Sequence, residues 1–384
     1  MTKQKRSAVT ANSSSKVRNR SGNPAVRSGE AEPAARPAKS PSVANRQPPK
    51  PTPASPSPAS VVETGVLPPD GASYPQILRG ESYTWWRSVL GVVFGLSLFL
   101  LVTTVVSQGL VTLFWATTAG DQQYQDYFAK AFAFELPIGM LAVNVGLAAL
   151  IPIAWGLMAA VHHMRPRWLS SVQPRIRWRY LVACLAIAAV VLNGVMLLST
   201  TVGKELSYQP QKGFWGFLVV IVLTSPIQAA AEEVFFRGYL LQALGSLVAR
   251  PWFGIIVSSL VFALLHGTQN LPLFADRLAF GLLAALLVWR TGGLEAGIAA
   301  HVINNVFAYL VAGLTTSIAA LKAIKGIGWV DAAFDVGGFA IFAVLAYALS
   351  RLMRLRTHVA LTEQTAGNGG RVVPNRFGAQ YGLQ

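Results

Sequence analysis

The chain has 384 residues, of which 53% are hydrophobic and 12% are charged, and its mean hydropathy is +0.45. Soluble globular proteins carry about 25% charged residues, so this composition excludes an ordinary soluble enzyme. The formal net charge of +16 does not indicate a nucleic-acid partner, because half of the excess lies in residues 1–79, which hold 12 Lys and Arg against 4 Asp and Glu.

The N-terminal residues 1–80 are rich in Pro, Ser, Ala and basic side chains. Such a segment buries too little apolar surface to offset its chain entropy, so we predict a disordered cytoplasmic tail. This tail is interpreted as a solvated tether, or as an arm that docks on anionic lipid headgroups or a partner. We predict a transmembrane domain over residues 81–356 and a short polar tail over 357–384.

Eight apolar segments follow the tail, and most are long enough to cross a bilayer core of about 30 Å. The fifth is short for a complete crossing, which fits a helix buried in a bundle or one that runs into a membrane-embedded loop. We therefore predict an all-α fold, a polytopic membrane helix bundle of about eight transmembrane helices. The segments are 88–114, 134–161, 180–200, 214–243, 252–266, 272–290, 294–314 and 334–355.

Basic residues gather in the connections that lie on one side of these segments. Because Lys and Arg are enriched in cytoplasmic loops, we predict that both termini are cytoplasmic. The residues concerned follow the second, fourth, sixth and eighth segments and are His162, His163, Arg165, Arg167, Arg175, Arg177, Arg179, Arg250, Arg290, Arg351, Arg354 and Arg356.

The fourth apolar segment contains two adjacent acids and an arginine, and ionisable residues inside a membrane are candidate functional residues. Glu233 and Arg237 are four apart with the acid first, which places them on one helical face as an ion pair. Glu232 points about 100° away, so we predict that it is unpaired and faces a cavity. Desolvation would tune such a carboxyl toward accepting a proton from water, as a general base must. The alternative is a buried ion network that only holds helices together.

Two histidines and an asparagine lie in neighbouring apolar segments. His301 and Asn305 are four apart and share a face, which pairs an acid–base group or metal ligand with a hydrogen-bond donor for an oxyanion. Such residues also serve as interhelical hydrogen-bonding groups, and the same holds for His266. Glu232, His301 and His266 lie about 16, 10 and 21 Å from the cytoplasmic ends of their segments, so we expect their polar groups in one membrane layer.

Other polar residues in or near the apolar segments are interpreted as structural. Asp276 and Arg277 would pair with each other, with lipid headgroups or with a loop, and His162 and His163 would belong to a basic cytoplasmic loop. The single cysteine, Cys184, would be a small apolar packing residue.

Three motifs on successive segments resemble those of the CPBP intramembrane proteases, also called the Abi or CAAX-protease family. The resemblance covers about residues 214–314 as a motif core and extends to the sequence Thr291-Gly292-Gly293-Leu294. It implies hydrolysis of a peptide bond in a membrane-associated peptide or protein, in the lipid bilayer of a bacterial plasma membrane. The motifs are EExxxR, FxxxH and HxxxN, here Glu232–Arg237, Phe262–His266 and His301–Asn305.

The resemblance leaves two mechanisms open. In the first, which we slightly prefer, Glu232 activates water, His266 and Asn305 stabilise the oxyanion, and His301 assists in positioning. In the second, Glu232, His266 and His301 would bind Zn²⁺ and leave one position for water. The site residues implied by the family are Glu232, Glu233, Arg237, His266, His301 and Asn305.

Two functions of other classes compete with an intramembrane protease. A catalytically silent scaffold or bacteriocin immunity factor could use the same fold, although such a protein does not need an intact reactive set. A proton-coupled transporter could use buried Glu and His as a proton relay, and it would produce no new peptide termini.

Overall fold

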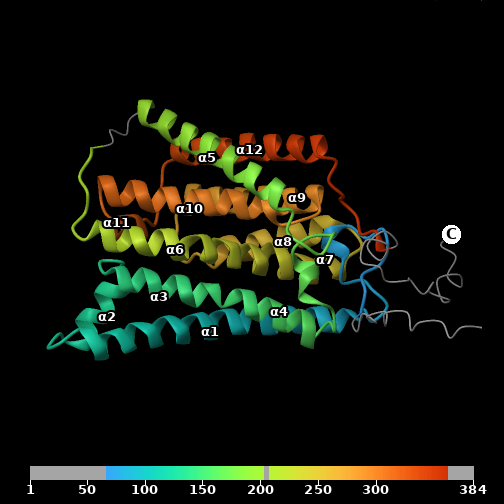
Figure 1. The fold of residues 1–384 in the computed structure, drawn as a ribbon, viewed down its shortest axis with the longest axis horizontal. Helices are drawn as coiled ribbons and strands as arrows, with labels where there is room; N and C mark the ends of the chain where they lie inside the picture. The colour runs from blue at the N-terminus through green and yellow to red at the C-terminus, as the bar shows by residue number, and fades with distance from the viewer. Residues whose placement is uncertain (1–65, 203–206, 362–384) are drawn as a thin grey trace, which may run out of the picture. The chain divides into compact units, whose positions relative to one another are not determined.

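The computed structural model describes residues 66–202 and 207–361, and within these ranges the chain is helical and contains no strand (Figure 1). Seven helical stretches in the described chain are long and apolar enough to cross a membrane, so the protein is an integral multi-pass membrane protein. They are Trp85–Thr118, Pro137–Ala160, Trp178–Val202, Phe214–Leu247, Leu271–Thr291, Glu295–Thr315 and Trp329–Leu352.

The predicted all-α membrane bundle is confirmed, and the predicted number of crossing segments is close. The fifth predicted segment is the shorter apolar helix α8, Pro251–Leu264. The second span consists of α3, Pro137–Ala148, and α4, Leu150–Ala160. Two short helices, α2 at Tyr124–Phe132 and α11 at Ile318–Lys322, were not predicted, because neither has a long apolar run.

Neighbouring helices follow one another across the bundle from α1, Trp85–Thr118, to α12, Trp329–Leu352. α1 packs on α3, α3 on α6, α6 on α10, α10 on α5 and α5 on α12 (Figure 1). α9 packs between α8 and α12. The central position of α6 and α10 encloses their polar residues in protein. The bounds of these helices are Trp178–Ser199 for α5, Phe214–Glu232 for α6, Leu271–Thr291 for α9 and Glu295–Thr315 for α10.

The segments that flank α1 and α12 meet at one end of the bundle. Ser73 and His358 form an antiparallel bridge, the Gly71 N–H donates to the Val359 carbonyl at 2.9 Å, and the Leu361 N–H donates to Asp70 Oδ1 at 3.0 Å. Both described ends of the chain therefore lie at the same end of the bundle. The cytoplasmic assignment of that side stays a prediction.

The predicted disordered tail 1–80 extends too far along the chain. Residues 66–80 are folded: Tyr74 and Ile77 are fully buried, and Arg79 Nε donates to the Ser246 carbonyl at 2.8 Å. This part is still rich in proline, but it also brings apolar side chains, among them Tyr74, Ile77 and Leu78, to the core. Residues 1–65 and 362–384, the rest of the two predicted tails, lie outside the described residues.

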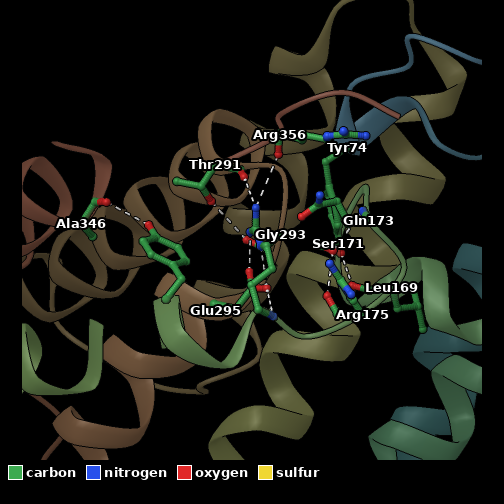
Figure 2. A network of polar contacts seen from close by, with 12 residues as sticks. Tyr74, Leu169, Ser171, Gln173, Arg175, Thr291, Gly293, Glu295, Ala346 and Arg356 are labelled. Atoms are coloured by element: carbon green, nitrogen blue, oxygen red, sulfur yellow. Dashed lines mark hydrogen bonds and ion pairs between the residues drawn. The ribbon is translucent and has the colours of Figure 1, made fainter. Parts of the chain in front are cut away.

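A buried ion pair joins the start of α5 to the start of α10 at this end (Figure 2). Arg177 Nε and Nη2 donate to the two carboxylate oxygens of Glu295 at 2.8 and 2.5 Å, and Arg177 Nη1 donates to the Thr291 carbonyl at 2.7 Å. Arg177 is 8% exposed and Glu295 is fully buried. One guanidinium thus connects α5, the end of α9 and the first residue of α10.

Two glycines between α9 and α10 make room for this pair. Gly292 ends α9 with φ of +72°, the left-handed conformation that favours glycine after a helix. A Cβ on Gly293 would lie 2.4 Å from Arg177 Nη2 and 2.5 Å from Glu295 Oε2. The Gly292-Gly293 sequence therefore allows the ion pair to fix where α10 begins, six residues before His301.

Candidate functional site

The adjacent acids lie at a change of helix type. α6 ends at Glu232, and the following residues Glu233–Leu240 (η4) are π-helical before α7, Leu241–Leu247, resumes the α-helix. π-helical turns have i→i+5 hydrogen bonds and occur frequently at functional sites. The sequence analysis predicted an uninterrupted helix here, because helical periodicity alone does not distinguish the two types.

The ion pair predicted between Glu233 and Arg237 is present. Arg237 Nη1 donates to Glu233 Oε1 at 2.9 Å, and the two residues are 1% and 0% exposed. The guanidinium also lies over the Phe262 ring, 4.0 Å from its centroid, and 5.2 Å from that of Phe280. Because a buried charge is costly unless it is paired, Arg237 keeps Glu233 ionised inside the bundle.

Glu232 is buried but not unpaired, which corrects the sequence-based prediction. Its Oε1 accepts a hydrogen bond from Gln228 Nε2 at 2.6 Å, and its side chain is 11% exposed. Gln228 precedes Glu232 by one helical turn and shares its face. Gln228 was not among the predicted site residues, although an amide within an apolar helix is a signal that could have revealed it.

His301 joins the two acids from α10. Its Nδ1 lies 2.9 Å from Glu233 Oε1 and its Nε2 lies 3.6 Å from Glu232 Oε2. Because an ionised carboxylate only accepts, Nδ1 carries the hydrogen that is donated to Glu233. In neutral His301, Nε2 would then present its lone pair to Glu232 Oε2. One proton, held either by Nε2 or by Oε2, would make the contact between these two atoms attractive.

Asn305 lies one turn further along α10, and it is the next polar group of the cluster. Its Nδ2 donates to Gln228 Oε1 at 3.1 Å, and Asn304 Nδ2 donates to its Oδ1 at 3.3 Å. The predicted common face of His301 and Asn305 therefore points toward α6. The hydrogen bonds run without a break from Asn305 through Gln228 to Glu232.

His266 is more peripheral than the other five predicted site residues. It follows α8, its Nδ1 is bound to the Phe262 carbonyl at 2.8 Å, and its ring packs against that of Phe262 with centroids 4.6 Å apart. The Phe262 ring also packs edge-on against His301, 6.1 Å away. His266 thus reaches the cluster through a shared aromatic ring, and its exposed side chain borders the site.

The predicted metal option stays a prediction. Across residues 66–202 and 207–361, no three His, Cys, Asp or Glu side chains are grouped so that they could hold a metal ion. His301 Nδ1 is bound to Glu233 and His266 Nδ1 to the Phe262 carbonyl, so Nε2 is the nitrogen that each imidazole has left for a further partner. The geometry therefore supplies an acid–base cluster of two carboxylates, an imidazole and two amides.

The residues interpreted as structural lie outside this cluster, with one difference. Arg277 Nη1 donates to Gln269 Oε1 at 2.7 Å, and Cys184 is buried in the core. His162 is not a solvated loop residue, however: it is 6% exposed and its Nε2 lies 3.2 Å from the Tyr239 hydroxyl on η4. The turn after α4 folds back onto the bundle, which its basic composition did not indicate.

Comparison with known proteins agrees with this site. Residues 214–307 match the family model described as type II CAAX prenyl endopeptidase Rce1-like. This segment carries the Rce1-like family domain. The match is consistent with a protease of the CPBP family, and the Rce1-like domain contains all six predicted site residues as well as Gln228.

Beyond the Rce1-like domain, similarity to known proteins is limited. The uncharacterized protein YyaK of Bacillus subtilis (strain 168) is 28% identical over 167 residues, which are 41% of this chain and 56% of YyaK. The match thus spans little more than half of the length of that relative. No solved structure matches the chain.

Proposed function

We propose that this protein is an intramembrane endopeptidase that hydrolyses a peptide bond in a membrane-associated peptide or protein. The observation that carries the proposal is the buried Glu232 carboxylate, which Gln228 holds through Oε1 while Oε2 faces His301 Nε2. A carboxylate in this setting is suited to general-base catalysis. The Rce1-like domain around it supports a peptidase reaction.

In the proposed reaction Glu232 accepts a proton from a water molecule as the water oxygen attacks the peptide carbonyl carbon. The carbonyl π electrons move to the oxygen, which forms a tetrahedral oxyanion. When this intermediate collapses, the C–N bond breaks and the proton held by Glu232 passes to the leaving nitrogen. The products are one new carboxyl terminus and one new amino terminus.

The neighbouring residues have supporting roles in this proposal. Asn305 and His266 are the proposed donors to the oxyanion. His266 would donate through Nε2 in its protonated form, because its Nδ1 is bound to the Phe262 carbonyl. Glu233 and Arg237 orient His301, which faces Glu232 and positions it. Of the two mechanisms, we propose the one without a metal, in which the Glu232 carboxylate itself takes the proton from water.

The proposed substrate lies in or on the lipid bilayer, and the protein works in a bacterial plasma membrane with both termini in the cytoplasm. The basic connections on one side of the bundle support this orientation. The match to the Rce1-like family supports a substrate whose scissile bond is brought to the membrane by a lipid anchor or a transmembrane segment.

The test is a comparison of peptide termini across the membrane proteome. Cells that lack this protein would be complemented with wild type, with Glu232→Gln, or with Glu135→Gln, which changes an exposed acid as a matched control. We expect termini that are present with wild type and Glu135→Gln and absent with Glu232→Gln at equal membrane levels. Identical termini in all three strains would contradict a protease and favour a scaffold, an immunity factor or a transporter.

A further inference from the structure

Gln228 connects the two sides of the candidate site. It lies on α6, it is 5% exposed, and it makes hydrogen bonds to Glu232 on its own helix and to Asn305 on α10. Burying an amide in a membrane protein is costly unless its polar atoms are bonded, and both ends of this amide are bonded. No sequence motif of the site includes this residue.

The hydrogen bonds determine which way each amide points. Because an ionised carboxylate has no hydrogen to donate, the Gln228 NH₂ group must face Glu232. Its Oε1 therefore faces Asn305, and Asn305 must present its own NH₂ group to α6. One N–H of the Asn305 NH₂ group donates to Gln228 Oε1. The second N–H belongs to the same nitrogen and therefore lies on the same side of the Asn305 amide.

We propose that Gln228 is a positioning residue of the hydrolytic site. It holds Glu232 Oε1, so that Oε2 is directed at His301, and it sets the Asn305 amide with its donor side toward the reacting groups. This inference rests on the proposed function for its catalytic meaning. The contact with Glu232 itself is independent of any substrate.

The charged and titratable groups around Glu232 come from several elements. The reactivity of Glu232 therefore reflects all of these groups, and only a matched comparison isolates the contribution of Gln228. They are Arg237 on η4, His301 and Tyr309 on α10, His266 after α8 and Lys322 on α11.

Gln242 provides the matched control. It is also a buried glutamine of the same membrane span, it is 0% exposed, and its Nε2 donates to the Trp168 carbonyl at 3.1 Å. Gln228→Met and Gln242→Met remove the same amide at nearly equal volume. A purely structural role of Gln228 would make the two variants behave alike.

The first experiment labels Glu232 with dicyclohexylcarbodiimide, an apolar reagent that reacts with protonated carboxyl groups. Full-length wild type, Gln228→Met and Gln242→Met would be reconstituted in liposomes at one pH, and the labelling rates of Glu232 and Glu233 would be followed by mass spectrometry. Loss of the Gln228 hydrogen bond releases Glu232 Oε1, so the labelling rate of Glu232 should rise about 10-fold while that of Glu233 stays unchanged. Gln242→Met should match wild type.

The second readout is cleavage of a peptide that wild type releases in the terminus comparison. Gln228→Met should lower kcat by about 10- to 100-fold, as expected for a lost hydrogen bond to a charged group, with little change in KM. An unchanged labelling rate of Glu232 and an unchanged kcat would overturn the inference. A raised labelling rate in a chain that cleaves nothing would support the contact and contradict only the proposed function.

Discussion

At the scale of single residues, adjacent acids in one helix have different environments. Glu233 is enclosed by Arg237 and His301, whereas Glu232 has an amide partner and a partly accessible carboxylate. The difference arises because successive residues on a helix point in different directions. In the proposed reaction, Glu233 holds the site together and Glu232 acts as the base.

Removing the Arg237 guanidinium should destabilise the protein more than removing the guanidinium of an exposed arginine. Arg237→Met leaves Glu233 as an uncompensated buried charge, which costs about 3–5 kcal/mol in the free energy of unfolding. The double variant Glu233→Gln, Arg237→Met should regain part of this loss. Reversible unfolding in mixed micelles measures the free energy of unfolding of the single and the double variant, and Arg290→Met, which changes an exposed arginine, is the control. Equal stability of Arg237→Met and Arg290→Met would contradict the pairing.

Gly297 allows α10 to approach Glu233 closely. A Cβ on Gly297 would lie 2.7 Å from Glu233 Oε2, so Gly297→Ala must displace the carboxylate. We expect a loss of about 1–3 kcal/mol, typical of overpacking, together with lower cleavage activity. Gly109→Ala on α1 is the control, because nothing lies within 4 Å of its added Cβ. If Gly297→Ala and Gly109→Ala unfold at the same denaturant concentration, the result contradicts a close contact between Gly297 and Glu233.

At the scale of elements, two features set the height and rotation of the helices that carry the site. The π-helical segment η4 shifts the phase of the helix between Glu232 and Leu241. The Arg177–Glu295 ion pair fixes the start of α10 and hence the depth of His301 and Asn305. η4 itself carries Glu233 and Arg237, whereas the Arg177–Glu295 pair lies outside the cluster, and both features help to decide where the polar groups meet.

The Arg177–Glu295 pair should show strong energetic coupling. Each single variant, Arg177→Met or Glu295→Leu, strands a buried charge, whereas the double variant removes both. We expect the double variant to lose less stability than the sum of the singles, with a coupling energy of about 0.5–3 kcal/mol. A double-mutant cycle of unfolding in mixed micelles measures this energy. Additive losses would show that the two side chains do not stabilise each other.

At the scale of the whole molecule, the segments outside the membrane spans are part of the packed structure. Residues 66–80 and 357–361 bond to each other at one end of the bundle, and the turn after α4 returns His162 to Tyr239. Burial, together with the charges of Arg87 and His163, lowers the pKa of His162 to about 4. The folded protein therefore excludes a proton that the unfolded chain binds near its ordinary value of about 6.5.

This difference predicts a loss of stability on acidification. Between about pH 6.5 and pH 4 the unfolded chain binds more protons at His162 than the folded chain does. The free energy of unfolding therefore decreases as the pH is lowered through this window, and it levels off below about pH 4. The total is on the order of 3 kcal/mol. Unfolding of wild type and His162→Gln should differ in slope over this window, while the exposed His358→Gln should follow wild type. Parallel curves for wild type and His162→Gln would contradict a buried neutral His162.

The amino-acid sequence by itself determined the membrane bundle and most of the site. Apolar runs of bilayer length predict spans because no other structure satisfies the backbone there, and four-residue spacing predicts the shared faces of Glu233 with Arg237 and of His301 with Asn305. The same local rules missed the fold of residues 66–80, whose apolar side chains pack mainly on α7, a helix that lies more than 150 residues later in the chain.

Only the tertiary structure decided how the polar groups are shared. Gln228 binds both Glu232 and Asn305, and His301 bridges two acids that sequence analysis had assigned to separate tasks. These contacts join α6 to α10 across about 70 residues of chain, and local spacing carries no information about such distant partners. Helical periodicity specifies which face a residue occupies, whereas the packing of whole helices specifies what that face meets.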